Sequence, residues 1–466
     1  MATNLAEKIV IEERQQQLEK IGYREKIGYA SGDLACNLIY QTVTTYLLFF
    51  YTDVFGISAA AAGVMFLIVR VIDAVLDPII GLAVDRTNTR WGRFRPYLLF
   101  GAIPFAIFAI FCFTTPDFSD IGKLVYAYIT YILLSITYTT INVPYGALTS
   151  AITQDNKEVV SLTSIRMLFA NIGGLVVAFG VPLIAALLSD TAGAGKERGW
   201  QLTMAIMGVA GAALLLFSFF NTKERVKFTH TETEKIMFSD VFEQFKVNRP
   251  LVVLCTFFII IFGVNSIINS VGIYYVSYNV GRPDMVKWYG LLGSLPAIIL
   301  MPLIPMLNKW LGKKMLLRLS LILAIIGTLA LVVIPASMVG LILVARAVSA
   351  VGCLVAGGFM WALIPETIDY GEYKTGKRLS GLIYAMIGFF FKFGMALGGI
   401  VPGIVMQSFG YVANQTQTPE ALTGILITTA VIPTIILVLA LVDLNFYKLD
   451  EKEHSRIVAE LRARVE

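Results

Sequence analysis

Three ionisable residues interrupt a long apolar run near the start of the chain. They are Arg70, Asp73 and Asp77. Spacings of three and four residues place the three side chains on one face of a helix. Two neighbouring buried carboxylates repel each other, so one of them is expected to stay protonated or to bind a cation. This face therefore predicts reversible binding of a proton or cation, and a salt-bridge cluster that only holds helices together is the alternative.

The composition indicates that these residues lie in a membrane protein. Hydrophobic residues make up 57% of the 466 residues and charged residues only 15%, against roughly 25% charged residues in soluble domains. Apolar runs such as 251–263 and 422–442 are long and are not interrupted by polar residues at regular spacing. A bilayer-spanning helix needs about 20 mostly apolar residues. The net charge of +5 comes from basic residues between apolar runs, which indicates membrane topology and not nucleic-acid binding.

The predicted fold is an all-α membrane protein with twelve transmembrane helices in two six-helix halves, residues 31–220 and 250–447. A cytoplasmic N-terminal segment (1–30), a cytoplasmic linker (221–249) and a cytoplasmic tail (448–466) complete it. Of the 37 Lys and Arg residues, 29 fall in the segments predicted to be cytoplasmic and five in the outside loops, as the positive-inside rule requires. Two six-span halves joined by a polar linker are the layout of the major facilitator superfamily.

Further charges lie inside or at the edge of the predicted spans. A charge at the bilayer centre costs about 2.5–3.5 kcal/mol on insertion scales, so it indicates a partner, a cavity or a function. We expect Asp33, Arg166 and Lys392 to face a polar cavity. The alternatives are interface positions for Asp33 and Arg166, and a side chain that reaches toward the interface for Lys392. Arg346 is left without a predicted role.

Metal and enzyme chemistry are not indicated. The four cysteines are scattered through hydrophobic stretches, with neither metal-ligand nor disulfide spacing. The sequence contains no His-Glu-x-x-His zinc motif, no Gly-x-Ser-x-Gly nucleophile motif and no nucleotide-binding loop. We therefore expect no enzyme activity, no metal site and no cofactor.

Aromatic and amide residues accompany the charges. Tyr138, Asn142 and Tyr145 are three to four residues apart and share a helix face, while Trp361 and Tyr384 lie in the second half. Sugars bind through hydrogen bonds to charged and amide groups and by stacking on aromatic rings. Each aromatic residue alone is more often a packing residue, but together with the charges the set favours a polyhydroxylated solute.

Four motifs together resemble one family, the glycoside–pentoside–hexuronide:cation symporters. They are Tyr51-Thr-Asp53, Arg70-Val-Ile-Asp-Ala-Val-Leu-Asp-Pro78, Arg90-Trp-Gly-Arg-Phe-Arg-Pro96 and Asp369-Tyr-Gly-Glu-Tyr-Lys374. The resemblance runs from about Tyr23 to Leu449. Within the family, the stretch 410–419 looks most like the glucuronide and xyloside carriers.

The resemblance implies roles for individual positions. The cation-coupling residues that it implies are Asp73, Asp77, Thr139 and Asn142. The substrate-binding residues that it implies, together with the aromatic pattern, are Asp33, Tyr138, Arg166, Lys392 and Trp361. The acids match the coupling-cation site of the family, and Asp33, Arg166 and Lys392 match polar residues near the sugar in the melibiose carriers.

The sequence departs from the melibiose carriers at three positions. Leu76 stands where the sodium-using branch has Asn, Asn142 replaces an Asp, and Gly146 replaces a Trp that lies near the sugar in those carriers. Loss of an oxygen ligand weakens a site for a metal cation, which needs several such ligands, whereas a proton needs one titratable carboxylate. We expect proton coupling, with a sodium ion at Asp73 and Asp77 as the alternative.

The predicted function is secondary active symport of a sugar, glycoside or hexuronide with a cation, by alternating access between the two halves. A sodium-coupled symporter and an uncoupled facilitator are the alternatives, and a facilitator does not need the acids of the second span. We expect a multi-pass monomer in the bacterial cytoplasmic (inner) membrane, with both termini in the cytoplasm. Its partners are the sugar, the coupling cation and the lipid bilayer, and no nucleic acid.

Charged residues in two predicted cytoplasmic loops suggest a gate. They are Arg93, Asp369, Glu372 and Arg378. Each exposed charge pair is worth only about 0–1 kcal/mol, but several pairs can bias two states of similar energy. We expect these residues to close the inner side when the carrier opens outward.

Lys392 provides a direct test of the predicted cavity. Because a cavity lysine acts on the substrate and not on folding, Lys392→Ala should reduce sugar uptake far more than it reduces the amount of folded protein in the membrane. Uptake in cells and the quantity of monodisperse purified protein measure the two effects. Normal uptake by a well-expressed variant would assign Lys392 a packing role.

Overall fold

The computed structural model describes residues 21–153, 155–191, 195–226, 238–300, 303–377, 379–449 and 451–463. These residues are helical or lie in short connections, and the strand pairing among them amounts to one isolated bridge between Thr89 and Gly92. The chain's contacts divide it into two compact units: unit 1 is Met1–Val43 with Ile72–Thr231, and unit 2 is Thr44–Val71 with Glu232–Glu466. The prediction of an all-helical protein is confirmed.

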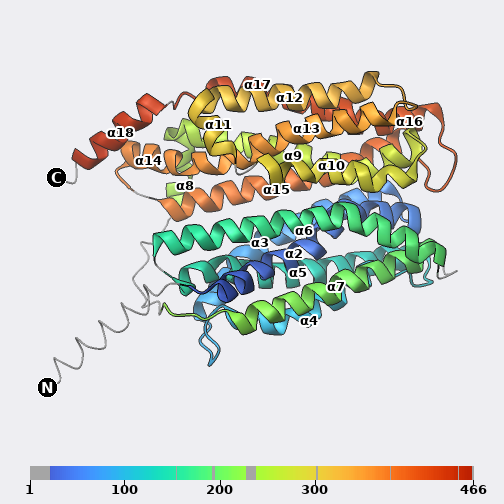
Figure 1. Ribbon diagram of the computed structural model, residues 1–466, viewed down its shortest axis with the longest axis horizontal. Helices are drawn as coiled ribbons and strands as arrows, with labels where there is room; N and C mark the ends of the chain where they lie inside the picture. The colour runs from blue at the N-terminus through green and yellow to red at the C-terminus, as the bar shows by residue number, and fades with distance from the viewer. Residues whose placement is uncertain are drawn as a thin grey trace. The chain divides into compact units, whose positions relative to one another are not determined.

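Six long helices carry the first part of the chain (Figure 1). They are α2 (Tyr23–Phe49), α3 (Ala59–Arg86), α4 (Arg95–Cys112), α5 (Asp120–Ile152), α6 (Asn156–Thr191) and α7 (Gly195–Asn221). A π-helical segment, η1 (Phe50–Val54), continues α2. Because the unit boundaries fall at residues 43/44 and 71/72, α2 and α3 each begin in one unit and end in the other.

The helices of the second part all lie in unit 2. They are α8 (Phe238–Val247), α9 (Arg249–Tyr274), α10 (Val286–Leu300), α11 (Ile304–Leu311), α12 (Lys313–Val333), α13 (Val339–Met360), α14 (Ile364–Thr375), α15 (Ser380–Ser408), α16 (Pro419–Leu426), α17 (Ile432–Asp443) and α18 (Glu451–Ala463). Two π-helical segments, η2 (Tyr275–Asn279) and η6 (Ile427–Val431), extend α9 and α16. Buried apolar side chains of α9, α12, α13, α15 and α17 form the core of the unit.

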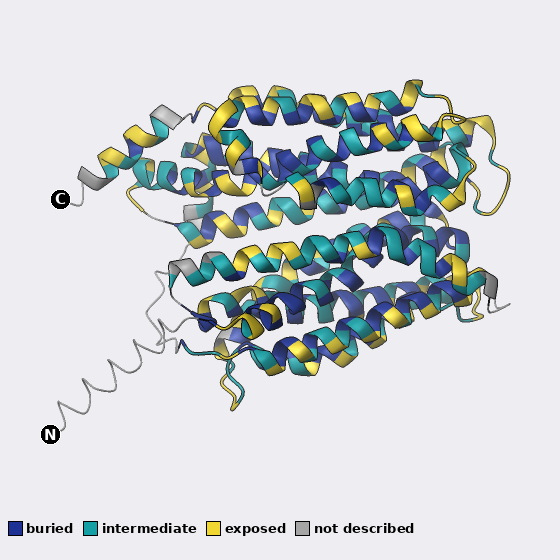
Figure 2. Ribbon diagram, viewed as in Figure 1, coloured by how far each residue is buried: buried dark blue, intermediate teal, exposed yellow. Residues whose placement is uncertain are grey.

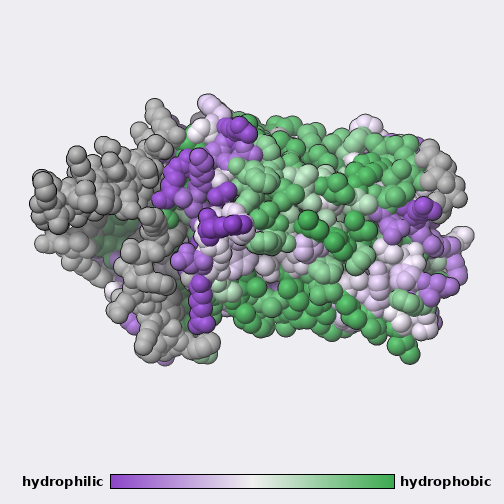
Figure 3. All heavy atoms as spheres, turned by 90° about the horizontal axis from the view of Figure 1, so that it is seen from below, coloured by the Kyte–Doolittle hydropathy of each residue, from purple (hydrophilic) through white to green (hydrophobic). Residues whose placement is uncertain are grey.

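Ten helices of the described chain are long and apolar enough to cross a membrane, judged by length and composition. Large apolar side chains stay exposed on them, for example Phe100 of α4, Val209 of α7 and Val333 of α12. Figure 2 shows such exposed positions along α7 and α12, and Figure 3 shows a broad hydrophobic band between hydrophilic ends on one face. An exposed apolar surface of this extent is what contact with lipid tails requires.

Glycines bring α9 and α15 into close contact within unit 2. A Cβ added at Gly263 would lie 3.2 Å from the carbonyl oxygen of Gly394, and Ser266 Oγ donates to the Met395 carbonyl at 3.1 Å. Small residues let two membrane helices approach until their backbones touch. The contact fixes the helix that carries Lys392 against α9.

Glu224 organises the predicted cytoplasmic end of unit 1. Its carboxylate accepts hydrogen bonds from the backbone N–H groups of Arg93 (2.7 Å), Phe94 (2.8 Å) and Arg95 (2.9 Å), at the start of α4. The first N–H groups of a helix have no intrahelical acceptor, and a negative charge there is favoured by the helix dipole. Gly92 (φ 107°) allows this approach because a side chain at that position would collide with the carboxylate.

Glu224→Ala is expected to destabilise unit 1, because the α4 N-terminus loses its acceptor. A lost N-terminal cap costs about 0.5–2 kcal/mol, and each kcal/mol lowers the melting temperature of a domain of this size by about 2–4 °C. Thermal unfolding of the detergent-purified protein measures the change. Glu243→Ala, at an exposed glutamate of α8, is the matched control, and equal melting temperatures for the two variants would contradict the proposed capping role.

Candidate functional site

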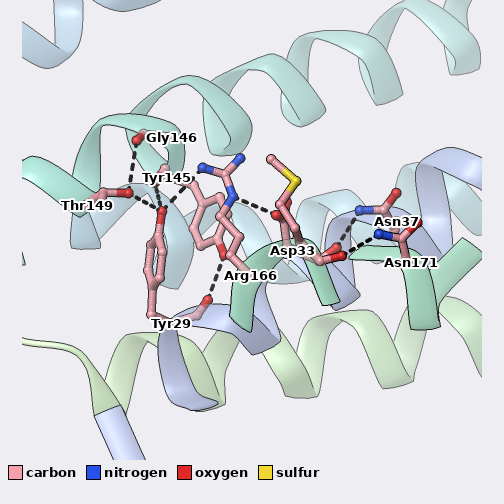
Figure 4. Close-up of polar contacts among 9 residues, drawn as sticks. Tyr29, Asp33, Asn37, Tyr145, Gly146, Thr149, Arg166 and Asn171 are labelled. Carbon is pink, nitrogen blue, oxygen red and sulfur yellow. Dashed lines mark hydrogen bonds and ion pairs between the residues drawn. The ribbon is translucent and has the colours of Figure 1, made fainter. Parts of the chain in front are cut away.

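An ion pair links two helices of unit 1, as Figure 4 shows. Arg166 Nε of α6 lies 2.6 Å from Asp33 Oδ2 of α2, with side-chain exposures of 23% and 10%. The two residues are 133 positions apart in the sequence. The structure therefore brings together two of the residues predicted to bind substrate, and it leaves the guanidinium partly accessible.

Two tyrosines hold this pair in place. Tyr29 and Tyr145 stack with ring centroids 4.9 Å apart, and the Arg166 guanidinium lies 5.2 Å from the centre of the Tyr145 ring. Tyr145 donates its hydroxyl proton to the Tyr29 carbonyl oxygen (2.7 Å), and Arg166 Nη1 donates to the Tyr29 hydroxyl (3.4 Å). Gly32 makes room, because a Cβ there would lie 2.5 Å from the Tyr145 ring.

Two of the predicted cation-coupling residues, Asp73 and Thr139, meet between α3 and α5. Asp73 is 3% exposed, and its Oδ1 accepts hydrogen bonds from the hydroxyls of Ser135 and of Thr139, the latter at 3.5 Å. Asp77 and Asn142 are half-buried on the same two helices. Sequence reasoning missed Ser135, although its position four residues before Thr139 puts it on the same helix face.

Tyr138 stacks on a tyrosine that was not predicted. Its ring centroid lies 4.4 Å from that of Tyr40 of α2, with an interplanar angle of 15°. Tyr138 and Tyr40 are both half-buried. A stacked aromatic pair of this kind offers a flat apolar surface with polar hydroxyl ends.

The remaining substrate-binding candidates lie in unit 2. Trp361 is 44% exposed, and its ring packs edge-on against Phe258 (centroids 5.0 Å apart) and Phe391 (6.0 Å). Lys392 follows Phe391 directly and is half-buried. Trp361, Phe258 and Phe391 form one aromatic cluster in which α9, η5 (Trp361–Leu363) and α15 meet.

Two of the predicted gate residues, Arg93 and Asp369, have partners within their own units. Arg93 Nε donates to the Val84 carbonyl oxygen (3.0 Å), and Asp369 Oδ2 of α14 lies 3.0 Å from His454 Nε2 of the tail helix α18. Glu372 is half-buried on α14, and Arg378 lies outside the described residues. The contact between Asp369 and the tail was not predicted, because neither side chain shows its partner in the local sequence.

Arg346, which had no predicted role, packs inside unit 2. It is 6% exposed, its Nη2 donates to Asn269 Oδ1 of α9 (3.1 Å), and its guanidinium lies 5.2 Å from the centre of the Tyr289 ring of α10. Gly293 leaves room for it, since a Cβ there would meet the guanidinium. Arg346 therefore joins α13 to α9 and α10.

Comparison with known proteins gives consistent matches over nearly the whole chain. The profile of the family described as MFS/sugar transport protein matches residues 28–451. The uncharacterized symporter YnaJ of Bacillus subtilis is 70% identical over 96% of both chains. Two relatives are 34% identical: the isoprimeverose transporter of Lactiplantibacillus pentosus, over 95% of this chain and 91% of its own, and the glucuronide carrier protein homolog of Escherichia coli, over 95% and 96%.

A solved structure supports the fold. A bacterial homolog of the human lysosomal transporter Spinster matches with a TM-score of 0.68 and 15% sequence identity, over 94% of this chain and 99% of its own. The major facilitator fold predicted from the sequence is thus confirmed, and the family profile and relatives are those of transporters, not enzymes. The chain is a multi-pass membrane protein that belongs to the glycoside–pentoside–hexuronide:cation symporter family of the major facilitator superfamily.

Proposed function

We propose that this symporter couples the entry of one sugar or glycoside to the entry of a proton. The observation that carries the proposal is Asp73, a carboxylate 3% exposed within a membrane helix, where it meets hydroxyls of α5. A buried carboxylate at such a position marks an ion or proton pathway. Substrate and proton would then cross by alternating access, with both termini in the cytoplasm.

The donors around Asp73 support a proton as the coupling ion. The hydroxyls of Ser135 and Thr139 donate hydrogen bonds to the Asp73 carboxylate, so protein donors, and not a metal cation, satisfy this oxygen. Leu76 brings no oxygen to α3 beside Asp77, and Asn142 brings an amide instead of a second carboxylate. Sodium is the second candidate, because the same hydroxyl oxygens can also act as ligands.

The Asp33–Arg166 pair supports an uncharged sugar at unit 1. A carboxylate beside a guanidinium presents acceptors and donors to adjacent hydroxyls, and the two charges compensate each other. A hexuronide adds a carboxylate, which would need a further cation, and Lys392 is the candidate for it. The two relatives that are equally similar to this chain are named for different sugars, so the choice between a neutral glycoside and a hexuronide rests on these charges.

Charged residues near the predicted cytoplasmic end also suit a gate. Asp369 and Glu372 remain candidates to pair with the basic loop of Arg93 during the cycle. The contact of Asp369 with His454 adds the tail helix α18 as a competitor for the same carboxylate. Such a competition would make closing of the transport pathway on the cytoplasmic side depend on the position of the tail helix.

Asp77→Asn separates coupling from sugar binding. Asn has nearly the same shape as Asp but cannot ionise, so the variant should still exchange labelled sugar across the membrane and should fail to accumulate it uphill. Counterflow and pH-driven uptake in proteoliposomes measure the two activities. Uphill accumulation at the parental level would refute the role of Asp77.

The same assay identifies the ion. We expect parental uptake to change little when sodium is replaced by potassium. Sodium-dependent uptake would contradict the proposal that the coupling ion is a proton, but it would not contradict the proposed location of the ion site.

The Asp33–Arg166 pair is tested by single and double variants. Asp33→Ala or Arg166→Ala leaves one charge without its partner, so each should be less stable than the parent by about 1–3 kcal/mol. The double variant should recover part of that stability, because no lone charge remains, while all three should lose most sugar uptake.

Melting temperature and uptake separate the two effects, and Arg198→Ala, at an exposed arginine of α7, is the control. Wild-type uptake by the double variant would show that the pair only holds α2 to α6.

A further inference from the structure

Two helix ends in unit 2 have the same unusual backbone. Both α2 and α9 end in π-helical segments, η1 and η2. Phe55 N–H bonds to the Phe50 carbonyl (2.8 Å), and at the equivalent place Val280 N–H bonds to the Tyr275 carbonyl (3.0 Å). A glycine in the left-handed region follows each segment, Gly56 at φ 83° and Gly281 at φ 69°. The two ends are thus equivalent parts of the two halves.

These equivalent ends bind each other. Asp53 of η1 and Tyr278 of η2 occupy matching positions, 225 residues apart, and the Tyr278 hydroxyl donates to the Asp53 carboxylate. Thr52 Oγ1 donates to Asp53 Oδ2 (2.6 Å) and lies 2.7 Å from the Tyr274 hydroxyl. A π-helical turn often marks a functional position in a helix, and here it aims polar side chains at the facing segment.

The loop between α15 and α16 completes the cluster. The Tyr411 hydroxyl lies 2.7 Å from both carboxylate oxygens of Asp53, and Asn414 Nδ2 donates to the Asp53 carbonyl. Burial, and then the neighbouring Tyr274 and Asp53, raise the pKa of Tyr411, so its hydroxyl stays protonated as a donor. Asn414 adopts φ 58°, a conformation that asparagine tolerates better than most residues.

Backbone contacts extend this attachment along the start of α3. Ala60 N–H donates to Gln407 Oε1 of α15 (2.7 Å), and a Cβ at Gly63 would lie 3.1 Å from the Ile400 carbonyl oxygen. These contacts explain why residues 44–71, which belong by sequence to the first half, group with the second half. In Figure 1 the loop before α16 lies at the end of the unit opposite the C-terminus, the end predicted to face outside.

We propose that Asp53, Tyr278 and Tyr411 form an extracytoplasmic latch of the transport cycle. The latch holds the outer ends of the first two spans against those of the seventh and eleventh, and it opens each time the site is exposed to the outside. It rests on the proposed alternating-access function. Hydroxyl–carboxylate bonds suit this role because water replaces each partner when the segments separate, whereas a closed latch excludes water and keeps the bonds strong.

Tyr411→Phe tests the latch, because it removes the hydroxyl and keeps the ring. The reporter is Ser270→Cys in a protein whose four native cysteines are replaced by alanine. Ser270 lines a small pocket with Thr44 and Arg70, roughly two helical turns before Tyr278. We expect a membrane-impermeant maleimide added outside to label Cys at this position about tenfold faster in Tyr411→Phe and in Asp53→Asn, since each loses a charge-assisted bond.

Tyr23→Phe, at an exposed tyrosine that begins α2, is the matched control and should label at the parental rate. Unchanged labelling in both latch variants would overturn the proposal. The labelling rate is measured without sugar and without an ion gradient. A negative result would therefore contradict the latch even if gradient-driven uptake is observed, and a finding of uncoupled transport would leave the latch untouched.

A disulfide cross-link holds the latch closed, whereas the variants above weaken it, so it tests the proposal independently. Thr52→Cys with Asn414→Cys places a cysteine on each side of the latch. We expect the oxidised protein to lose sugar uptake and to recover it after reduction. Uptake that continues with the disulfide formed would show that these segments do not separate during transport.

Discussion

Within a bilayer, polar groups must find their partners inside the protein, because lipid offers none. Different buried side chains of this protein meet this constraint with different kinds of partner. Arg166 is compensated by Asp33 and by a tyrosine ring, Asp73 by hydroxyls, and Arg346 by an amide oxygen and a ring face. The chemistry of each partner decides what its site can do.

The two polar sites of unit 1 suit different functions. The Asp33–Arg166 pair offers hydrogen-bond acceptors and donors side by side and suits hydrogen bonding to a polyhydroxylated solute. Asp73 accepts hydrogen bonds from the hydroxyls of Ser135 and Thr139, and a carboxylate can gain or lose a proton during a transport cycle. Unit 1 therefore combines a fixed polar pair with a carboxylate that can change its state, which is the combination that coupled transport needs.

The two halves of the chain repeat the same helix end, but different side chains at the equivalent positions allow the two ends to bind each other. The ends of α2 and α9 share their backbone hydrogen bonds and their glycine, but one carries a carboxylate and the other a hydroxyl at the matching place. An acceptor facing a donor makes a bond, whereas two identical carboxylates would repel. Divergence at one position converts a repeated helix end into a contact between the two halves.

The sequence by itself determined the class of protein and the residues worth examining. Apolar run lengths, the bias of basic residues and four short motifs predicted the helical fold and the family, because these depend on local composition. The helical spacing of Arg70, Asp73 and Asp77 likewise follows from the sequence alone. Only the tertiary structure decided the partners: Ser135 for Asp73, Tyr40 for Tyr138, Glu224 for the start of α4 and His454 for Asp369. Such partners lie on different helices, and local periodicity shows which face of a helix is polar but not which helix that face will meet.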